Sequence, residues 1–275
     1  MNGAIRETPP MNALRSNDLS GRVAIVTGGS RGIGRGISEL LASHGATVAV
    51  NFRSDAESAA ETVAAIEAAG GAAAAFCASV DAADDCARLV ADVMSAFGRI
   101  DIVVCNAGIA SRGRAVADTD PEEMMRVVAT HAFGPHHLSR EAIPHLRTAA
   151  GETGRADIVM ISSVATTYMS ANGAPYNMGK SAMEALAKTL SREERPHRVH
   201  VNVVAPGLVE TDMGIRLTRA MTGQRDLQDL RSLDAASPFG RVCQPDDIAQ
   251  AVLWLVGPGS GYVTGQRIEV DGGGR

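Results

Sequence analysis

The chain has 275 residues, a formal net charge of −5, and 45% hydrophobic against 21% charged residues. This acidic balance argues against a nucleic-acid-binding surface, and no segment approaches the roughly 18–20 consecutive apolar residues that a membrane-spanning helix requires. The four cysteines have neither metal-ligand spacing nor a paired framework, which favours reduced, partly buried thiols in a cytoplasmic protein.

Strand-like and helix-like segments alternate along the chain and predict a single doubly wound α/β domain of the Rossmann type. Residues 1–20 lack periodicity and are predicted to be a disordered N-terminal leader, so that the domain covers 21–275. Seven short apolar runs are the expected strands of one parallel sheet flanked by helices. The expected strands cover 22–27, 46–51, 72–78, 100–105, 156–162, 199–204 and 266–270, and the expected helices cover 32–43, 55–69, 83–97, 121–147, 174–194 and 245–256.

The first expected strand runs directly into a glycine-rich turn that opens a helix. Glycine permits a tight turn and lets backbone N–H groups approach a pyrophosphate, while the helix N-terminus adds its partial positive charge. This strand, turn and helix together predict a dinucleotide-phosphate site. The expected cofactor contacts in the turn are Gly28, Ser30, Arg31, Gly32, Ile33 and Gly34.

A tyrosine and a lysine, Tyr176 and Lys180, stand four residues apart and therefore lie on one face of a helix. A phenol titrates near ~10, and an adjacent ammonium group is expected to lower the pKa of the tyrosine. Ser163 precedes Tyr176 by thirteen residues and could place its hydroxyl at the same point. The three side chains predict a site that polarises and protonates a carbonyl oxygen.

These motifs, taken in order, resemble the classical short-chain dehydrogenases/reductases over about residues 20–274. The chain ending is most similar to the 3-oxoacyl-[acyl-carrier-protein] reductase branch, although related sugar, polyol and steroid dehydrogenases share such endings. The family motifs are Thr27-Gly28-x-x-x-Gly32-x-Gly34, Asn106-Ala107-Gly108, Ser163, Tyr176-x-x-x-Lys180 and Pro206-Gly207; the branch motifs are Pro238-Phe239-Gly240-Arg241, Pro245-Asp246-Asp247-Ile248 and Thr264-Gly265-Gln266 with Val270-Asp271-Gly272-Gly273.

The resemblance implies the roles of the three catalytic side chains. Tyr176 would give its proton to a substrate oxygen while NADPH passes a hydride to the carbon. Lys180 would lower the pKa of the tyrosine and hydrogen-bond the nicotinamide ribose, and Ser163 would hold the carbonyl oxygen. Ser162 is an adjacent alternative, but the thirteen-residue offset favours Ser163.

The resemblance also implies further cofactor contacts at the carboxyl ends of the strands, where such folds bind ligands. Ser79 and Val80 would lie at the adenine, and the segment 106–108 would line the adenosine ribose and the floor of the nucleotide cleft. The loop 206–211 would contact the nicotinamide. The residues concerned are Ser79, Val80, Asn106, Ala107, Gly108, Pro206, Gly207, Val209 and Thr211.

The end of the second strand bears on the choice of nicotinamide cofactor. An NAD site needs an acid there for the ribose 2′-hydroxyl, and Phe52 stands where NAD-specific members of the family carry Asp. Arg53 follows it and Arg31 sits in the glycine turn, so two guanidinium groups could bind a 2′-phosphate. We therefore expect NADP(H), with NAD(H) as the alternative if both arginines are only solvated surface charges.

The chain departs from the family at three positions. His131 stands where most members carry Asn in the fourth helix, and its imidazole could relay protons or impair the relay. Ser79 replaces an acid and could bond adenine through one hydroxyl only, and Arg198 fills the place of a Gly before the sixth strand. The spacing of the histidines near His131 does not suit metal ligands, so we expect surface or capping roles and no metal.

The segment 208–237 is predicted to be a substrate lid, or equally an ordinary amphipathic helix pair over the core. Three functions remain open. The first is an NADPH-dependent reductase of small carbonyl compounds, including 3-oxoacyl thioesters, and the second is a dehydrogenase of a sugar, polyol or steroid alcohol. The third is a nucleotide-binding regulator with little catalysis, against which the intact Ser163, Tyr176 and Lys180 argue. The resemblance implies a homotetramer or dimer.

Overall fold

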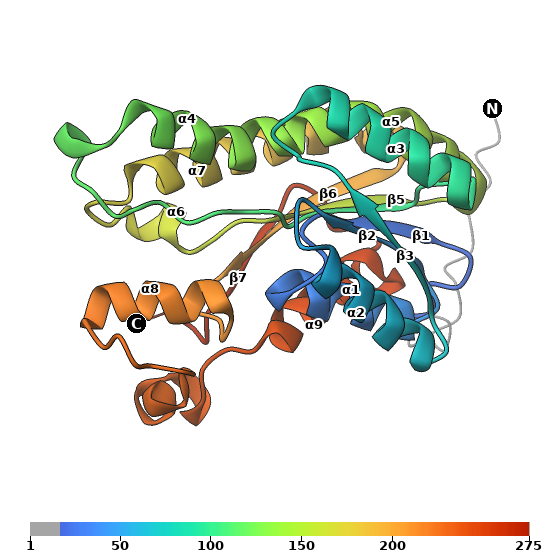
Figure 1. Ribbon diagram of the computed structural model, residues 1–275. Helices are drawn as coiled ribbons and strands as arrows, with labels where there is room; N and C mark the ends of the chain where they lie inside the picture. Colours follow the sequence, from blue (N-terminus) through green and yellow to red (C-terminus); the bar gives the residue numbers. More distant parts are fainter. Residues whose placement is uncertain (1–16, 275) are drawn as a thin grey trace.

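The computed structural model describes residues 17–274 and has a central sheet with helices on both faces (Figure 1). The seven strands are all parallel and follow the order β3-β2-β1-β4-β5-β6-β7. The prediction of a single doubly wound α/β domain with a seven-stranded parallel sheet is thus confirmed. The strands are β1 (Val23–Val26), β2 (Thr47–Phe52), β3 (Ala72–Cys77), β4 (Ile102–Cys105), β5 (Ala156–Ile161), β6 (Val199–Pro206) and β7 (Arg267–Val270).

The helices form two layers, with α3, α4, α5 and α7 on one face of the sheet and α1, α2 and α9 on the other (Figure 1). The short helix α6 follows β5, and α8 lies in the segment after β6. The helices are α1 (Gly32–Ser43), α2 (Ala56–Ala68), α3 (Ala83–Phe97), α4 (Pro121–Val128), α5 (Gly134–Thr153), α6 (Ala165–Tyr168), α7 (Ala174–Glu193), α8 (Asp212–Thr222) and α9 (Pro245–Val256).

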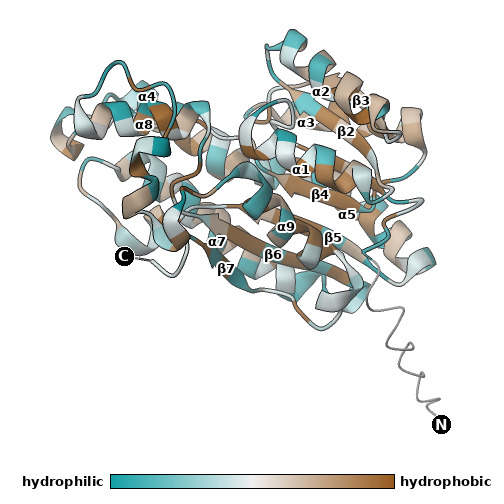
Figure 2. Cartoon of the chain, turned by 90° about the horizontal axis from the view of Figure 1, so that it is seen from below, coloured by the Kyte–Doolittle hydropathy of each residue, from teal (hydrophilic) through white to brown (hydrophobic). Residues whose placement is uncertain are grey.

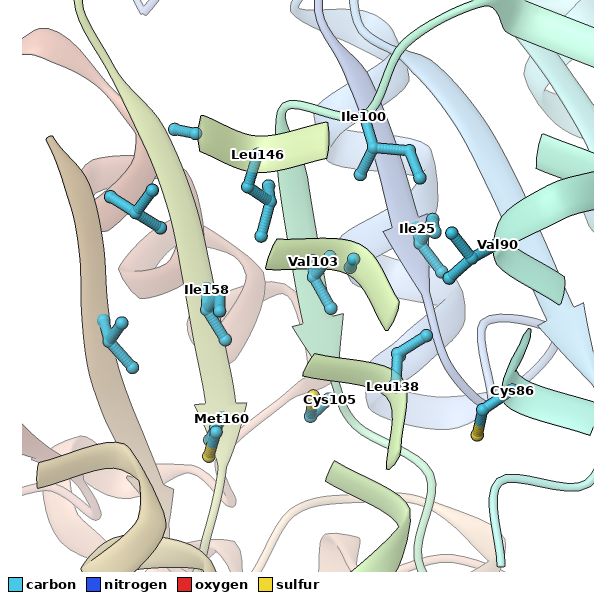
Figure 3. Close-up of a cluster of buried hydrophobic side chains, with 14 of the residues drawn as sticks. Ile25, Cys86, Val90, Ile100, Val103, Cys105, Leu138, Leu146, Ile158 and Met160 are labelled. Carbon is cyan, nitrogen blue, oxygen red and sulfur yellow. The ribbon is translucent and has the colours of Figure 1, made fainter. Parts of the chain in front are cut away.

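The alternation of side chains along each strand divides the core into two halves. Ile25 and Val103 point into the half under α3, α5 and α7, where Leu138 and Leu146 cover them (Figure 3). Val26 points into the other half, with apolar side chains of α1 and α9. Because both faces are covered, the central strands are hydrophobic throughout, as the brown strands in Figure 2 show.

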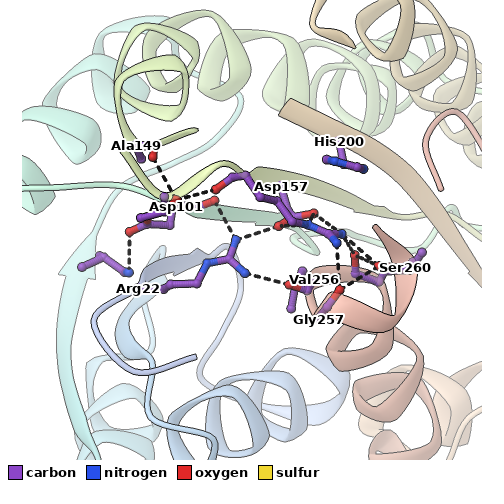
Figure 4. A network of polar contacts seen from close by, with 12 residues as sticks. Arg22, Asp101, Ala149, Asp157, His200, Val256, Gly257 and Ser260 are labelled. Carbon is purple, nitrogen blue, oxygen red and sulfur yellow. Dashed lines mark hydrogen bonds and ion pairs between the residues drawn. The ribbon is translucent and has the colours of Figure 1, made fainter. Parts of the chain in front are cut away.

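A network of charged groups connects the amino ends of the central strands to the end of α9 (Figure 4). The buried carboxylate of Asp157 on β5 accepts hydrogen bonds from Arg22 Nη2 at 2.6 Å and from Arg155 Nη2 at 2.7 Å. Both arginines also donate to carbonyls at the end of α9 or just after it: Arg22 Nη1 to Val256 and Arg155 Nη1 to Gly257. Cations at a helix C-terminus interact favourably with the helix dipole, so the network stabilises the fold. It lies at the amino ends of the strands, opposite to the glycine turn.

Two predicted boundaries are wrong. Leu19, assigned to the disordered leader, is buried against α1 and β2 side chains, and its N–H donates to His44 O; residues 1–16 lie outside the described residues. The helix expected over 121–147 is not continuous, because a π-helical turn at Ala129–Phe133 separates α4 from α5. Single π-helical turns inserted into α-helices frequently mark functional sites.

Arg198 and the predicted lid are both placed by the structure. Arg198 has a φ of +61°, a left-handed conformation that favours glycine, so the Gly whose place it fills would suit this backbone better. The segment 208–237 contains α8 and a 3₁₀ turn over Arg231–Ala236. It lies on the same side of the molecule as α6, beyond the carboxyl ends of the strands (Figure 1), and its role as a lid stays a prediction.

Candidate active site

The glycine turn after β1 leaves no room for a side chain at Gly34. A Cβ on Gly34 would lie 2.0 Å from the carbonyl oxygen of Gly28 and 2.5 Å from the Asn106 amide nitrogen. Gly28 itself has a φ of +59°, which side-chain-bearing residues rarely adopt. The turn can therefore pack directly on the start of α1, which is the geometry that a pyrophosphate site requires.

Two side-chain amides, the half-buried Asn106 and the buried Asn51, hold the turn in place. Asn106 Nδ2 donates to the carbonyls of Thr27 at 2.9 Å and Gly28 at 3.1 Å, and its backbone N–H donates to Thr27 Oγ1. Asn51 accepts from Gly28 N through Oδ1 and donates through Nδ2 to Ala78 O at the end of β3. The sequence motifs predict neither Asn51 nor the role of Thr27, although an amide in the apolar run before Phe52 is a recognisable signal.

The N-terminus of α1 suits an anion. No side chain caps it, and its first turn has no acidic residue, so its N–H groups are not engaged by a carboxylate of the helix. Arg31 is exposed and lies 3.8 Å from Asp55, the residue that caps α2. Arg53 is exposed at the end of β2. A pyrophosphate and a 2′-phosphate thus fit the residues present.

The predicted adenine contacts are partly occupied within the chain. Ser79 Oγ donates to Asp81, and the Ser79 N–H donates to Asp85 Oδ2 at 2.9 Å. Val80 and Ala107 line one small cavity beneath the end of β4. The structure therefore brings Val80 and Ala107 together, and it directs the Ser79 hydroxyl to an acid of its own loop.

The catalytic candidates meet at the carboxyl end of β5. Ser163 follows this strand, and α7 carries Tyr176 and Lys180 one turn apart. Lys180 is buried, and its Nζ donates to Ile161 O at 2.6 Å and lies 5.8 Å from the centre of the Tyr176 ring. Ser163 Oγ accepts from Ala165 N at 3.1 Å, which leaves its own proton free to be donated. Ser162 instead donates to Glu184.

The pKa of Tyr176 differs from the expectation. Burial raises it, while the nearby Ser163 hydroxyl acts in the opposite direction. Lys180 does not lower the pKa of Tyr176 here. Burial lowers the pKa of Lys180 itself to about 7, and its amine donates to Ile161 O. The phenol is therefore protonated near neutral pH and is ready to donate.

His131 lies in the π-helical turn and is fully buried. Its Nε2 is 2.8 Å from Ile109 O, and its ring packs edge-on against the Tyr176 ring at 5.0 Å. Gly108 and Gly179 make room for it, since a Cβ on either would lie within 3 Å of His131 atoms. Burial and the charge of Lys180 lower the pKa of His131 to about 3, so the ring is neutral.

The loop after β6 reaches back to the glycine turn. Thr211 caps α8 by accepting from Gly214 N at 3.1 Å, and its methyl carbon would lie 3.2 Å from a Cβ on Gly32. Gly207 follows the buried Pro206 and packs against Asp271, and Val209 pairs with Cys243 in an isolated bridge. The predicted nicotinamide residues thus lie on the glycine turn and on the end of β7.

Within residues 17–274, no group of three or more metal-ligating side chains comes together. The same part of the chain contains no helix that is long and apolar enough to cross a membrane.

Comparison with known proteins connects this site to a family. The family described as “Enoyl-(Acyl carrier protein) reductase” matches residues 28–274. Tetrahydroxynaphthalene reductase from Pyricularia oryzae is 37% identical over 264 residues, covering 94% of this chain and 91% of that protein.

Two solved structures have the same fold and contain NADP. The angucycline C-6 ketoreductase LanV with bound NADP superposes with a TM-score of 0.81 at 33% identity, covering 94% of this chain and 97% of that chain. A short-chain dehydrogenase from Burkholderia cenocepacia in complex with NADP has a TM-score of 0.80 at 32% identity, covering 92% and 98%. Together with the glycine turn and the grouping of Ser163, Tyr176 and Lys180, these matches establish that the chain belongs to the short-chain dehydrogenase/reductase family of oxidoreductases.

Proposed function

We propose that this protein is an NADPH-dependent ketone reductase. The observation that carries the proposal is the convergence of Ser163 and Tyr176 at the carboxyl end of β5, with the buried Lys180 one turn further along α7. When bound in the glycine turn, NADPH would supply the hydride that the carbonyl carbon receives.

Each of the three side chains has a part in the proton and charge balance. The Tyr176 hydroxyl donates its proton to the carbonyl oxygen as the C–O bond becomes single. Ser163 donates a hydrogen bond to the same oxygen, since its Oγ already accepts from Ala165 N. Lys180 has a pKa of about 7 and can therefore supply a proton near neutral pH to replace the one that Tyr176 has donated.

The protonated state of Tyr176 supports the direction of the reaction. Burial raises its pKa, so a proton donor is present at neutral pH, as reduction requires. Oxidation of a secondary alcohol by the same residues would need Tyr176 in its deprotonated form as the base. Reduction near neutral pH is thus the better supported of the two directions.

An apolar, cyclic ketone is the proposed substrate class. Two similar proteins are named for reactions on fused-ring compounds, tetrahydroxynaphthalene and angucycline. In this chain, exposed apolar side chains lie on the segments that flank the site: Tyr168 and Met169 after Ser163, and Leu217 on α8. A flat apolar ring system could pack between such segments. The 3-oxoacyl thioester predicted from the chain ending is the competing substrate.

Substrate assays with purified protein test the proposal. NADPH oxidation should accelerate with a fused-ring hydroxyaryl ketone, and Tyr176→Phe should lose turnover by about 100-fold or more while NADPH still binds. Turnover with a short 3-oxoacyl thioester alone would transfer the protein to that substrate class. Unchanged turnover in Tyr176→Phe would refute the mechanism.

The cofactor preference has its own test. Replacing both Arg31 and Arg53 by Ala should weaken NADPH binding about 10-fold or more and leave NADH binding nearly unchanged, because only NADPH has a 2′-phosphate. Equal losses for both cofactors would mean that the arginines do not contact that phosphate. Cytoplasmic location and assembly into a homotetramer or dimer stay predictions from the sequence.

A further inference from the structure

Three consecutive residues at the end of β5 are each held by a different partner. Lys180 Nζ donates to Ile161 O at 2.6 Å. Ser162 Oγ donates to Glu184 Oε1 at 2.5 Å, and Arg267 Nη2 donates to Ser163 O at 3.2 Å. The backbone that carries Ser163 is thus fixed from α7 on one side and from β7 on the other.

The carboxylate of Glu184 is the centre of this arrangement. Its Oε1 accepts from Ser162 Oγ, from Thr166 Oγ1 at 2.8 Å and from Arg267 Nε at 2.9 Å. These donors come from the end of β5, from α6 and from β7. Glu184 also follows Lys180 by one helical turn, so the same face of α7 presents Tyr176, Lys180 and Glu184 in succession.

Arg267 completes the contact with α6. Its Nη2 donates to Ser163 O and lies 2.9 Å from Thr166 Oγ1 and 3.0 Å from Thr167 Oγ1. The Glu184 and Arg267 side chains are only 21% and 26% exposed. A charge-assisted hydrogen bond with little solvent access is stronger and more directional than a surface ion pair.

We propose that Glu184 and Arg267 are positioning residues that hold Ser163 in line with Tyr176. The inference rests on the proposed function. Neither residue has to contact a substrate. The pair fixes the position of the Ser163 backbone relative to α7, the helix that carries the proton donor Tyr176. A displacement of about 1 Å at a reacting group can lower a rate by up to roughly 100-fold.

A double-mutant cycle separates positioning from simple anchoring of the edge strand. Glu184→Gln keeps the shape and the acceptor oxygen but removes one of the two carboxylate charges that pair with Arg267, while the other, Glu269, stays in place. Acting through Ser163, it should lower kcat about 10-fold in the wild-type background and less than about 2-fold in the Ser163→Ala background. The dissociation constant of NADPH, measured by its fluorescence, should not change, because the pair lies outside the glycine turn.

Glu194→Gln is the matched control at the C-terminal end of the same helix. Glu194 is buried at the far end of α7 and accepts from Arg147 Nε at 2.9 Å and Nη2 at 2.7 Å. It should lower the melting temperature and leave kcat within about 2-fold in both backgrounds. Should Glu184→Gln fail to fold, Arg267→Lys takes its place, since it keeps the charge but loses the fork that reaches Ser163 O.

The outcomes distinguish the two proposals. Equal kcat losses from Glu184→Gln in both backgrounds, or no loss at all, would overturn the positioning role and leave the proposed function intact. Unchanged turnover in Ser163→Ala alone would refute the proposed function, and this inference with it. A loss that appears only when Ser163 is present supports both.

Discussion

The buried His131 gives a prediction about stability in acid. In the folded chain burial holds the pKa of His131 at about 3, whereas an imidazole in an unfolded chain titrates near ~6.5. Between these values the unfolded chain binds one proton more than the folded chain, so this residue makes the free energy of unfolding fall as the pH falls below ~6.5. At a pH of about 5 the loss from this one group is about 2 kcal/mol.

Replacement by an amide removes that dependence. In His131→Asn the free energy of unfolding should fall less between a pH of about 7 and one of about 5, by a difference of about 2 kcal/mol from wild type, because asparagine does not titrate. Urea denaturation at the two pH values measures both differences. His136→Asn, on the same stretch but exposed, is the control and should behave as wild type. Identical pH dependence in wild type and His131→Asn would refute the argument that the buried ring stays neutral.

Three further substitutions, the first with a control, test the packing of the fold. Gly34→Ala should abolish NADPH binding in a fluorescence titration, because its Cβ would lie 2.0 Å from Gly28 O; Gly151→Ala, with open space around it on α5, should bind normally and gain about 1 kcal/mol of stability. Asp157→Asn leaves two partly buried arginines without their charge partner and should lose about 3 kcal/mol in urea denaturation with kcat unchanged. Arg198→Gly should raise the melting temperature, because it relieves a φ of +61° at a strain of roughly 1 kcal/mol; a lower melting temperature would contradict this.

The sequence predicts the central strands well because these strands are buried on both faces. The run expected over 156–162 contains β5 at Ala156–Ile161, and the run over 46–51 overlaps β2 at Thr47–Phe52. A parallel strand with helices on both sides has to be apolar throughout, so its boundaries show in the sequence. Tyr176 and Lys180 are predicted for a similar reason, since their relation is set by one turn of a single helix.

Contacts that depend on the assembled fold are not predicted. Glu184 and Arg267 are 83 residues apart and meet only because β7 lies beside β6 at the edge of the sheet. The π-helical turn is equally invisible in the sequence, because the space that accepts His131 is created by Gly108 and Gly179 from two other segments. Local periodicity contains no information on either arrangement.

Buried polar atoms without a hydrogen-bond partner occur at both ends of the strands. At the amino ends Asp157 has two arginine partners, and Arg22 Nε is left unpaired among the described residues. At the carboxyl edge His131 Nδ1 and Asp271 Oδ2 are buried without a hydrogen-bond partner among the residues from 17 to 274. An unpaired buried polar atom lowers the stability of the fold by about 1–3 kcal/mol. Selection for stability alone would replace such a residue. Both atoms lie next to loops of the candidate site, one beside Tyr176 and one beneath Gly207. We therefore expect apolar substitutions at these two positions to raise stability and lower turnover together, whereas substitutions in the Asp157 network change stability alone.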